Sequence, residues 1–415
     1  MAMSTSPIER ARELIRPPTL RTGEEATASR LELFFDLAFV LVVIELADSF
    51  YTDLSWRGAA TFAALFAALW LSWVGFTLYA NRFDTDDVVF RLAKLTATLG
   101  IAGCAAAASG ATTSYSTPFV ASFLITRVVL LVLHVRAWRH VEEARPTIAV
   151  YLGAHALTAT LWAVSLAVGG SARWVLWAVA VAVDVAGPIV ATWRGDKTPL
   201  HMEHLPERFS LFVILVLGEA VGGAATGVHD AKWAGMPVAV GVVGFVIAAA
   251  LWWNYFDITA THSEDELKAE DERDDEERGA AADERHDLFV YGHLPMSLGV
   301  VMAGVGLEDL VLHPDEAQPS TGAWVLVAGL LLYLLGSALI LGGIRRTWRA
   351  VWPWPTAALP LVLLAALPGH QSALLLVGVL AAIAVALAVV GTLQPGTVSP
   401  RDEEPDERRD EAGRV

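Results

Sequence analysis

The residues with the clearest chemical potential are acidic side chains inside long apolar stretches. Glu45 follows Glu32 by 13 residues, and Glu219 follows Glu207 by 12. At 1.5 Å of rise per residue, Glu45 and Glu219 would each lie roughly 18–20 Å along a helix, past the middle of a membrane. If they faced each other, they could bind a cation or pass a proton. The alternative is that each carboxyl hydrogen-bonds a neighbouring helix.

A second set of charges is placed nearer the helix ends. Glu32 and Asp36 are four residues apart and therefore share one helical face. Such close carboxylates repel each other unless a cation or proton intervenes. Arg91 and Lys94, three apart on the third apolar stretch, predict a contact between the first and third helices. Glu207 and His293 would repeat this contact in the second half of the chain. The alternative is a helix-locking salt bridge near the membrane interface, with Lys94 snorkelling.

Three further polar residues fall near the middle of apolar stretches. A charge at that depth is costly and normally faces protein or water. Arg127 therefore needs a partner, and Asp184 is the first candidate, with a structural role. His155 lies within the intervening stretch.

Signals for other chemistry are weak. His201, Glu203 and His204 have the residue types of a zinc site, but no clear third ligand follows. The sequence contains no glycine-rich phosphate loop and no GxSxG motif, so neither a cofactor nor a metal is expected, and the chain is not predicted to be an enzyme. Nothing indicates nucleic-acid binding. Six tryptophans fit an aromatic belt: Trp70, Trp73, Trp252, Trp253, Trp352 and Trp354.

The elements that position these side chains are transmembrane helices. The chain has 415 residues, of which 55% are hydrophobic and only 18% charged, and its mean hydropathy is +0.49. A helix needs about 20 apolar residues to cross the hydrocarbon core. Twelve spans are predicted, near residues 31–51, 58–79, 91–110, 118–138, 147–168, 173–193, 207–226, 236–258, 287–308, 323–344, 353–368 and 372–393. The fold class is therefore an all-α integral membrane protein.

Basic residues predict the orientation. With the N-terminus in the cytoplasm, 24 of the 29 Lys and Arg residues lie on the inner side, and Arg57, Arg173 and Lys232 lie outside. This bias follows the positive-inside rule. Both termini are thus predicted to be cytoplasmic, in the cell (inner) membrane. The start lacks the apolar core of a cleavable signal peptide.

An internal repeat divides the chain into two six-helix halves. Ala68-Leu69-Trp70 resembles Ala250-Leu251-Trp252, and FRLAKLTATLG from Phe90 resembles FVYGHLPMSLG from Phe289. An even number of spans in each half makes the repeat parallel. The predicted organisation is an N-terminal arm (1–30), halves 31–200 and 201–393, an acidic loop (263–287) and a disordered acidic tail (394–415).

Three stretches resemble the bacterial low temperature requirement A (LtrA) family. They are ELFFDLAFVLVVIELA from Glu32, ERFSLFVILVLGEAV from Glu207, and YGHLPMSLGVVMAGVG from Tyr291. They occur in the family's order, over about residues 25 to 393. The resemblance implies a multi-pass membrane protein named for a cold-growth phenotype, without an established substrate.

A shorter likeness concerns a channel family. Arg30, Phe34, Phe35 and Asp36 resemble the Arg-xxx-Phe-Ser-Asp start of the endosomal and lysosomal potassium-channel family, whose first helices line a pore. Phe35 replaces the Ser here. In the second half Phe209-Ser210 keeps that pair, but Leu211 stands in place of the Asp and Leu205 in place of the Arg.

Together these features predict a permease or channel-like protein for a small solute or monovalent cation. Glu45 and Glu219 would be its ligands or proton sites, and the charges at the helix ends would shape its inner gate. The alternative is a non-transporting scaffold or sensor in cold adaptation of the envelope. The lipid bilayer is the expected partner. The oligomeric state, a homodimer included, stays open.

Overall fold

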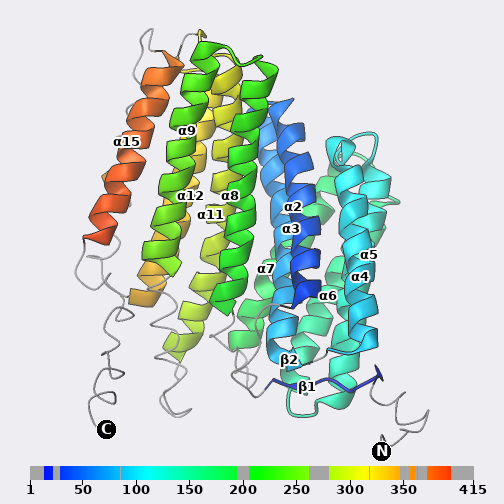
Figure 1. Cartoon of the computed structure of the whole chain (residues 1–415). Coiled ribbons are helices and arrows are strands. Elements are labelled where there is room, and N and C mark those ends of the chain that lie inside the picture. The colour runs from blue at the N-terminus through cyan, green and yellow to red at the C-terminus, as the bar shows by residue number, and fades with distance from the viewer. Residues whose placement is uncertain are drawn as a thin grey trace, which may run out of the picture.

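The structure, a computed structural model, describes residues 14–21, 29–84, 86–193, 205–260, 280–316, 318–345 and 372–393, with a few positions between 353 and 362. The predicted zinc-like residues, most of the acidic loop, the acidic tail, most of the eleventh span, Trp352 and Trp354 lie outside these residues. The described chain is a bundle of long helices (Figure 1).

The helices of the first half are α2 (Arg30–Tyr51), α3 (Trp56–Arg82), α4 (Val88–Ala106), α5 (Ser116–His140), α6 (Arg145–Ser165) and α7 (Ser171–Trp193). Those of the second half are α8 (Leu205–Asp230), α9 (Gly235–Trp253), α11 (Ala280–Leu312), α12 (Thr321–Arg345) and α15 (Ala373–Thr392). A short 3₁₀ helix, η1 (Ala108–Gly110), follows α4, and a π-helix, η2 (Asn254–Ala260), extends α9.

Ten of the described helices are long and apolar enough to cross a membrane, from α3 through α9 with η2, α11, α12 and α15. Helix α2 stands among them in the bundle but carries four acids, Glu32, Asp36, Glu45 and Asp48. The all-helical membrane architecture expected from hydropathy is therefore present in the described part of the chain.

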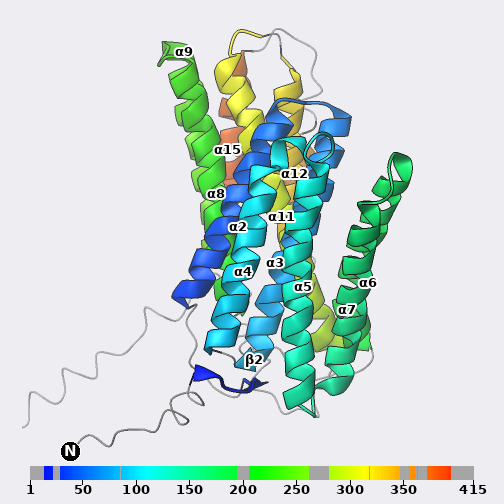
Figure 2. The same cartoon turned by 90° about the vertical axis from the view of Figure 1, so that its right-hand side faces the viewer.

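The two halves meet along a central seam. In Figure 1 the second half occupies the left side and the first half the right, with α2, α3, α8 and α11 between them. Contacts across the seam join α2 to α8 and α11, and α3 to α11 and α8. The view in Figure 2 shows α6 and α7 as a separate pair on the side away from α9. The first helices of both halves thus lie at the centre.

Local signals define where the central helix α2 begins. The Ser29 hydroxyl accepts from the backbone N–H of Glu32, and the Glu32 carboxylate accepts from the backbone N–H of Ser29. This reciprocal arrangement satisfies two donors that would otherwise be unpaired at a helix start. It also orients the Glu32 carboxylate at one end of the bundle.

That same end carries a small antiparallel sheet. Strand β1 (Thr19–Leu20) pairs with β2 (Phe83–Asp84), which follows α3. Buried Asp87 caps α4 and binds Arg136 of α5 at 2.6 Å. The end of the bundle that holds this sheet is called the β1–β2 end below.

Helices α11 and α12 pack unusually closely because glycines recur every seventh residue on both. Gly292, Gly299 and Gly306 of α11 lie against Gly336, Gly329 and Gly322 of α12. A Cβ on Gly329 would overlap the backbone N of Ala303 and lie 2.6 Å from the carbonyl oxygen of Gly299. Small residues allow such backbone contact, which membrane helices use because lipid offers no hydrophobic driving force.

We predict that Gly329→Val strongly lowers the stability of the protein. The new side chain collides with backbone atoms of α11, and overpacking of this kind costs about 1–3 kcal/mol or more. The apparent melting temperature in detergent measures the effect. Gly378→Val is the matched control, because a Cβ there meets nothing within 4 Å. Equal melting temperatures for the two variants would contradict the glycine packing.

Candidate functional site

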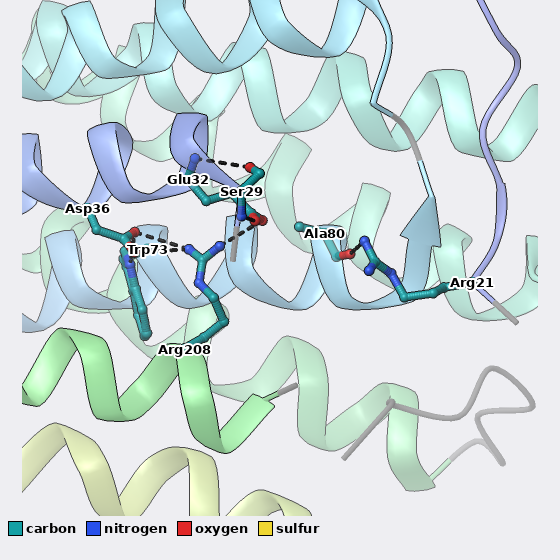
Figure 3. Close-up of polar contacts among 7 residues, drawn as sticks. All are labelled: Arg21, Ser29, Glu32, Asp36, Trp73, Ala80 and Arg208. Atoms are coloured by element: carbon teal, nitrogen blue, oxygen red, sulfur yellow. Dashed lines mark hydrogen bonds and ion pairs between the residues drawn. The ribbon is translucent and has the colours of Figure 1, made fainter. Parts of the chain in front are cut away.

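A buried ion network joins the first helices of the two halves. Arg208 of α8 binds Glu32 at 2.7 Å and Asp36 at 3.1 Å, both on α2 (Figure 3). The Arg208 side chain is 8% exposed and that of Asp36 is 0% exposed. Two carboxylates on one helical face are thus bridged by one guanidinium. Breaking such a buried pair leaves an uncompensated charge, so the network holds α2 and α8 together.

Aromatic side chains enclose this network. Trp73 of α3 donates its indole N–H to Asp36 at 2.8 Å. The same indole ring packs against Phe209 and Phe212 of α8, with ring centroids 5.0 and 4.5 Å apart. These contacts keep water away from the carboxylate and strengthen its electrostatic interactions.

Lys94 of α4 is buried beside the network without joining it. Its side chain is completely buried, and its ammonium lies 3.8 Å from the centroid of the Phe35 ring and 5.1 Å from that of Phe76. Among the described residues the ammonium has no hydrogen-bond partner. The charges of Glu32, Asp36 and Arg208 all act on it. Cation–π contacts therefore replace the salt bridge that a buried lysine would otherwise make.

The predicted contact between the first and third helices is thus corrected. The carboxylates of α2 pair with Arg208 across the seam, and Arg91 pairs instead with Asp86 at the surface, 2.8 Å away. Because the Asp86 carboxylate accepts hydrogen bonds from Arg91, the pKa of Asp86 lies below its ordinary value. Glu207 is exposed and, within the described part of the chain, forms no hydrogen bond or ion pair with His293. The guanidinium of Arg208, with several donors in a planar fork, suits two carboxylates better than an ammonium does.

His293 belongs to a different network in the second half. Its Nε2 lies 3.0 Å from the hydroxyl of Tyr255 in η2, which in turn lies 3.3 Å from the Ser210 hydroxyl of α8. Its Nδ1 lies 2.7 Å from the carbonyl oxygen of Phe289. Because a carbonyl can only accept, Nδ1 carries the proton and a neutral His293 accepts from Tyr255.

The two networks occupy matching positions in the sequence repeat. With Trp70 aligned to Trp252, Trp73 corresponds to Tyr255, and Lys94 corresponds to His293. In each half, the aromatic polar group of the second helix contacts the first helix near the same depth. The strongly charged version is confined to the first half.

The structure gives Glu45 and Glu219 different surroundings. Glu45 follows Asp36 by nine residues, which at 3.6 residues per turn turns it to the opposite side of α2. The charge on α2 that acts on Glu219 is that of Asp48, and Glu219 in turn acts on Glu308 of α11. The acidic neighbours at this depth are therefore Asp48, Glu219 and Glu308. Among the described residues, no hydrogen bond or ion pair joins Glu45 to Glu219.

Arg127 and Asp184 are paired as the sequence predicts. The two side chains, 1% and 4% exposed, meet at 2.8 Å. Arg127 also donates to the carbonyl oxygen of Ala68 at 3.2 Å and stacks on Phe123. The pair ties α3, α5 and α7 together, which is a structural role.

Sequence reasoning missed several members of the site. The sequence-based predictions give Arg208 no role, yet it is the central cation of the network. Trp70 and Trp73 were expected in an aromatic belt but are buried, whereas Trp252 and Trp253 are almost half exposed. The available signal was that Arg208 directly follows Glu207 at the start of an apolar helix. In the described ranges, no group of three His, Cys, Asp or Glu could hold a metal ion.

We predict that Arg208→Gln destabilises the protein by about 3–5 kcal/mol, because it leaves two buried carboxylates without a cation. Unfolding in mixed SDS micelles measures the loss. The triple variant with Arg208→Gln, Glu32→Gln and Asp36→Asn removes the unpaired charges and should recover part of the stability.

Arg91→Gln is the control for charge removal, since its pair with Asp86 is exposed on both sides. Surface pairs contribute little. A triple variant no more stable than Arg208→Gln alone would show that the three side chains do not form an energetic unit.

Comparisons with known proteins agree with this architecture. The chain matches the family described as "Bacterial low temperature requirement A protein (LtrA)" over residues 27–391. It is also 28% identical, over 326 residues, to an uncharacterized protein of Rhizobium meliloti (strain 1021), covering 76% of this chain and 77% of the relative. No solved structure matches the chain. With the match covering most of its length, this multi-pass membrane protein belongs to the bacterial low temperature requirement A family.

Proposed function

We propose that this protein transports a monovalent cation or another small solute through the seam between α2, α8 and α11. The observation that carries the proposal is the unpartnered, buried ammonium of Lys94 beside two carboxylates that Arg208 already holds. Either of two cations, Arg208 or Lys94, could pair with these carboxylates, which defines two alternative arrangements with the same net charge. A seam with two discrete arrangements is the kind of element on which alternating access depends.

In the described arrangement Arg208 binds Glu32 and Asp36 and closes the β1–β2 end of the seam. In the other arrangement Lys94 takes over the carboxylates, which releases Arg208 and lets α8 move away from α2. An ion or solute that binds one arrangement more tightly shifts the population toward it. The excess of basic residues on this side supports its assignment to the cytoplasm, with the network as the inner gate.

Acidic side chains support a cation as the transported species. Asp48, Glu219 and Glu308 come from the three helices of the seam and act on one another electrostatically. At the same end, opposite β1 and β2, a surface cavity of about 550 Å³ is lined by Asp309, His313, Asp315 and Glu316, among others. Clefts lined by one sign of charge raise the local concentration of counter-ions.

A non-transporting scaffold is the second candidate, and the close aromatic packing around Trp73 favours it. The contacts of Trp73 with Phe209 and Phe212 fill the seam beside the ion network. For a scaffold these contacts are the permanent state. For a transporter they belong to the closed state, so a flux measurement separates the two candidates.

We predict that purified protein in liposomes conducts K⁺, Na⁺ or H⁺ faster than protein-free liposomes. Lys94→Met should lower this flux about tenfold, because without the competing cation the carboxylates stay with Arg208. Lys232→Met is the matched control, since Lys232 is exposed beyond α8. No flux of any of the three ions would favour the scaffold, whereas equal flux in the two variants would show that Lys94 takes no part in transport.

We also predict that Glu219→Gln lowers the flux while Glu45→Gln leaves it nearly unchanged. Glu219 lies among the acids of the seam, whereas Glu45 points to the opposite side of α2 from Asp36. The same liposome assay measures both variants. A larger loss for Glu45→Gln would move the pathway to the other flank of α2.

A further inference from the structure

A small cavity lies between helices of the first half and α11, away from the contact of α2 with α8. Its volume is about 20 Å³, and helices α3, α6, α7 and α11 enclose it. Among its lining residues are Gly75, His155, Asp184, Gly187 and Tyr291. The ion network of Arg208 contributes nothing to its walls.

His155 is the unexplained residue of this cavity. It is only 6% exposed, and neither ring nitrogen has a hydrogen-bond partner in the described part of the chain. A neutral imidazole has one N–H donor and one bare nitrogen acceptor. Leaving both unsatisfied in a buried position is costly, so native proteins normally provide a partner.

The neighbouring rings do not supply that partner. His134 of α5 packs against His155 with ring centroids 4.8 Å apart, and its own Nδ1 lies 2.9 Å from the carbonyl oxygen of Leu130. Tyr151 lies one turn before His155 on α6, and its hydroxyl accepts from Arg82 at 2.9 Å. These contacts leave the cavity as the place where His155 can find a partner.

The cavity has the size and polarity that a water molecule needs. About 10–15 Å³ is sufficient for one water, provided that two or more polar groups surround it. Asp184 is one of the residues that line the cavity, and one oxygen of its carboxylate receives the hydrogen bond from Arg127 at 3.0 Å. A carboxylate oxygen has more than one acceptor site, so Asp184 can also accept from water.

We propose that this cavity binds a single water molecule that links the His155 ring to Asp184 between α6 and α7. The water accepts from the ring N–H, or donates to the bare ring nitrogen, and donates its other proton to Asp184.

The charged and titratable groups around His155 come from every helix packed against it. They are Arg127 and His134 on α5, Tyr151 on α6, Asp184 on α7 and Tyr291 on α11, and Arg82 on α3 acts on the neighbouring His134. The hydroxyl of Tyr291 donates to the carbonyl oxygen of Val185 at 2.7 Å. The hydroxyl oxygen of Tyr291 can therefore still accept a hydrogen bond from the water.

Solid-state NMR of [¹⁵N]histidine-labelled protein in lipid bilayers tests the proposal. With eleven histidines in the chain, His155→Gln identifies the signals of His155 by their loss. We expect magnetisation transfer from water protons to the His155 ring nitrogens. Ala154→Val fills the cavity and should abolish this transfer, whereas Ala156→Val, on the exposed side of α6, should not.

A second measurement covers the case in which Ala154→Val fails to fold. His155→Leu removes both polar ring nitrogens with a side chain close to histidine in volume. In a dry cavity this change eliminates two unsatisfied groups and raises the melting temperature. In a hydrated cavity it deprives the water on Asp184 of a partner, and we expect a drop of about 2–4 °C. A rise, or absence of water-to-ring transfer in the unmodified protein, would overturn the proposal.

Discussion

The guanidinium of Arg208, bound to Glu32 and Asp36, is the interaction on which the arrangement of the two halves depends. In a membrane, the hydrophobic effect does not drive helices together. Water is also absent from the hydrocarbon core, so charges there are costly unless they are paired. They must therefore be paired inside the protein. The pairing explains why α2, a helix with four acids, can stand among far more apolar neighbours, and why α8 lies against it at the β1–β2 end.

Polar groups and glycines divide the work of packing. Arg127–Asp184 ties helices within the first half, and the Ser210–Tyr255–His293 network does so in the second. The α11–α12 pair instead relies on backbone contact at glycines seven residues apart. The seam between the halves has a few buried charges and a stack of aromatic rings. The boundary between the halves therefore depends on ion pairs and aromatic rings, whereas the α11–α12 contact depends on close backbone packing.

The sequence and the structure agree most closely on single-helix properties. Hydropathy predicts the helices well, since each must cover the hydrocarbon core and satisfy its own backbone hydrogen bonds. The Arg127–Asp184 pair is also predictable, because a buried guanidinium demands a carboxylate and few are available. The glycines of α11 and α12 recur every seventh residue, but the tertiary structure decides which helix they pack against.

The sequence by itself determined the membrane-spanning helices, the family, and which side chains are too costly to leave unpaired. Only the tertiary structure decided the pairing: Glu32 and Asp36 bind Arg208 across the seam, Lys94 rests on aromatic rings, and Glu219 is grouped with Asp48 and Glu308. The physical reason is that the hydropathy of a helix depends on its own residues. The partner of a buried charge depends on which helices are neighbours and on how each is rotated about its axis, and neither is encoded in a single stretch of sequence.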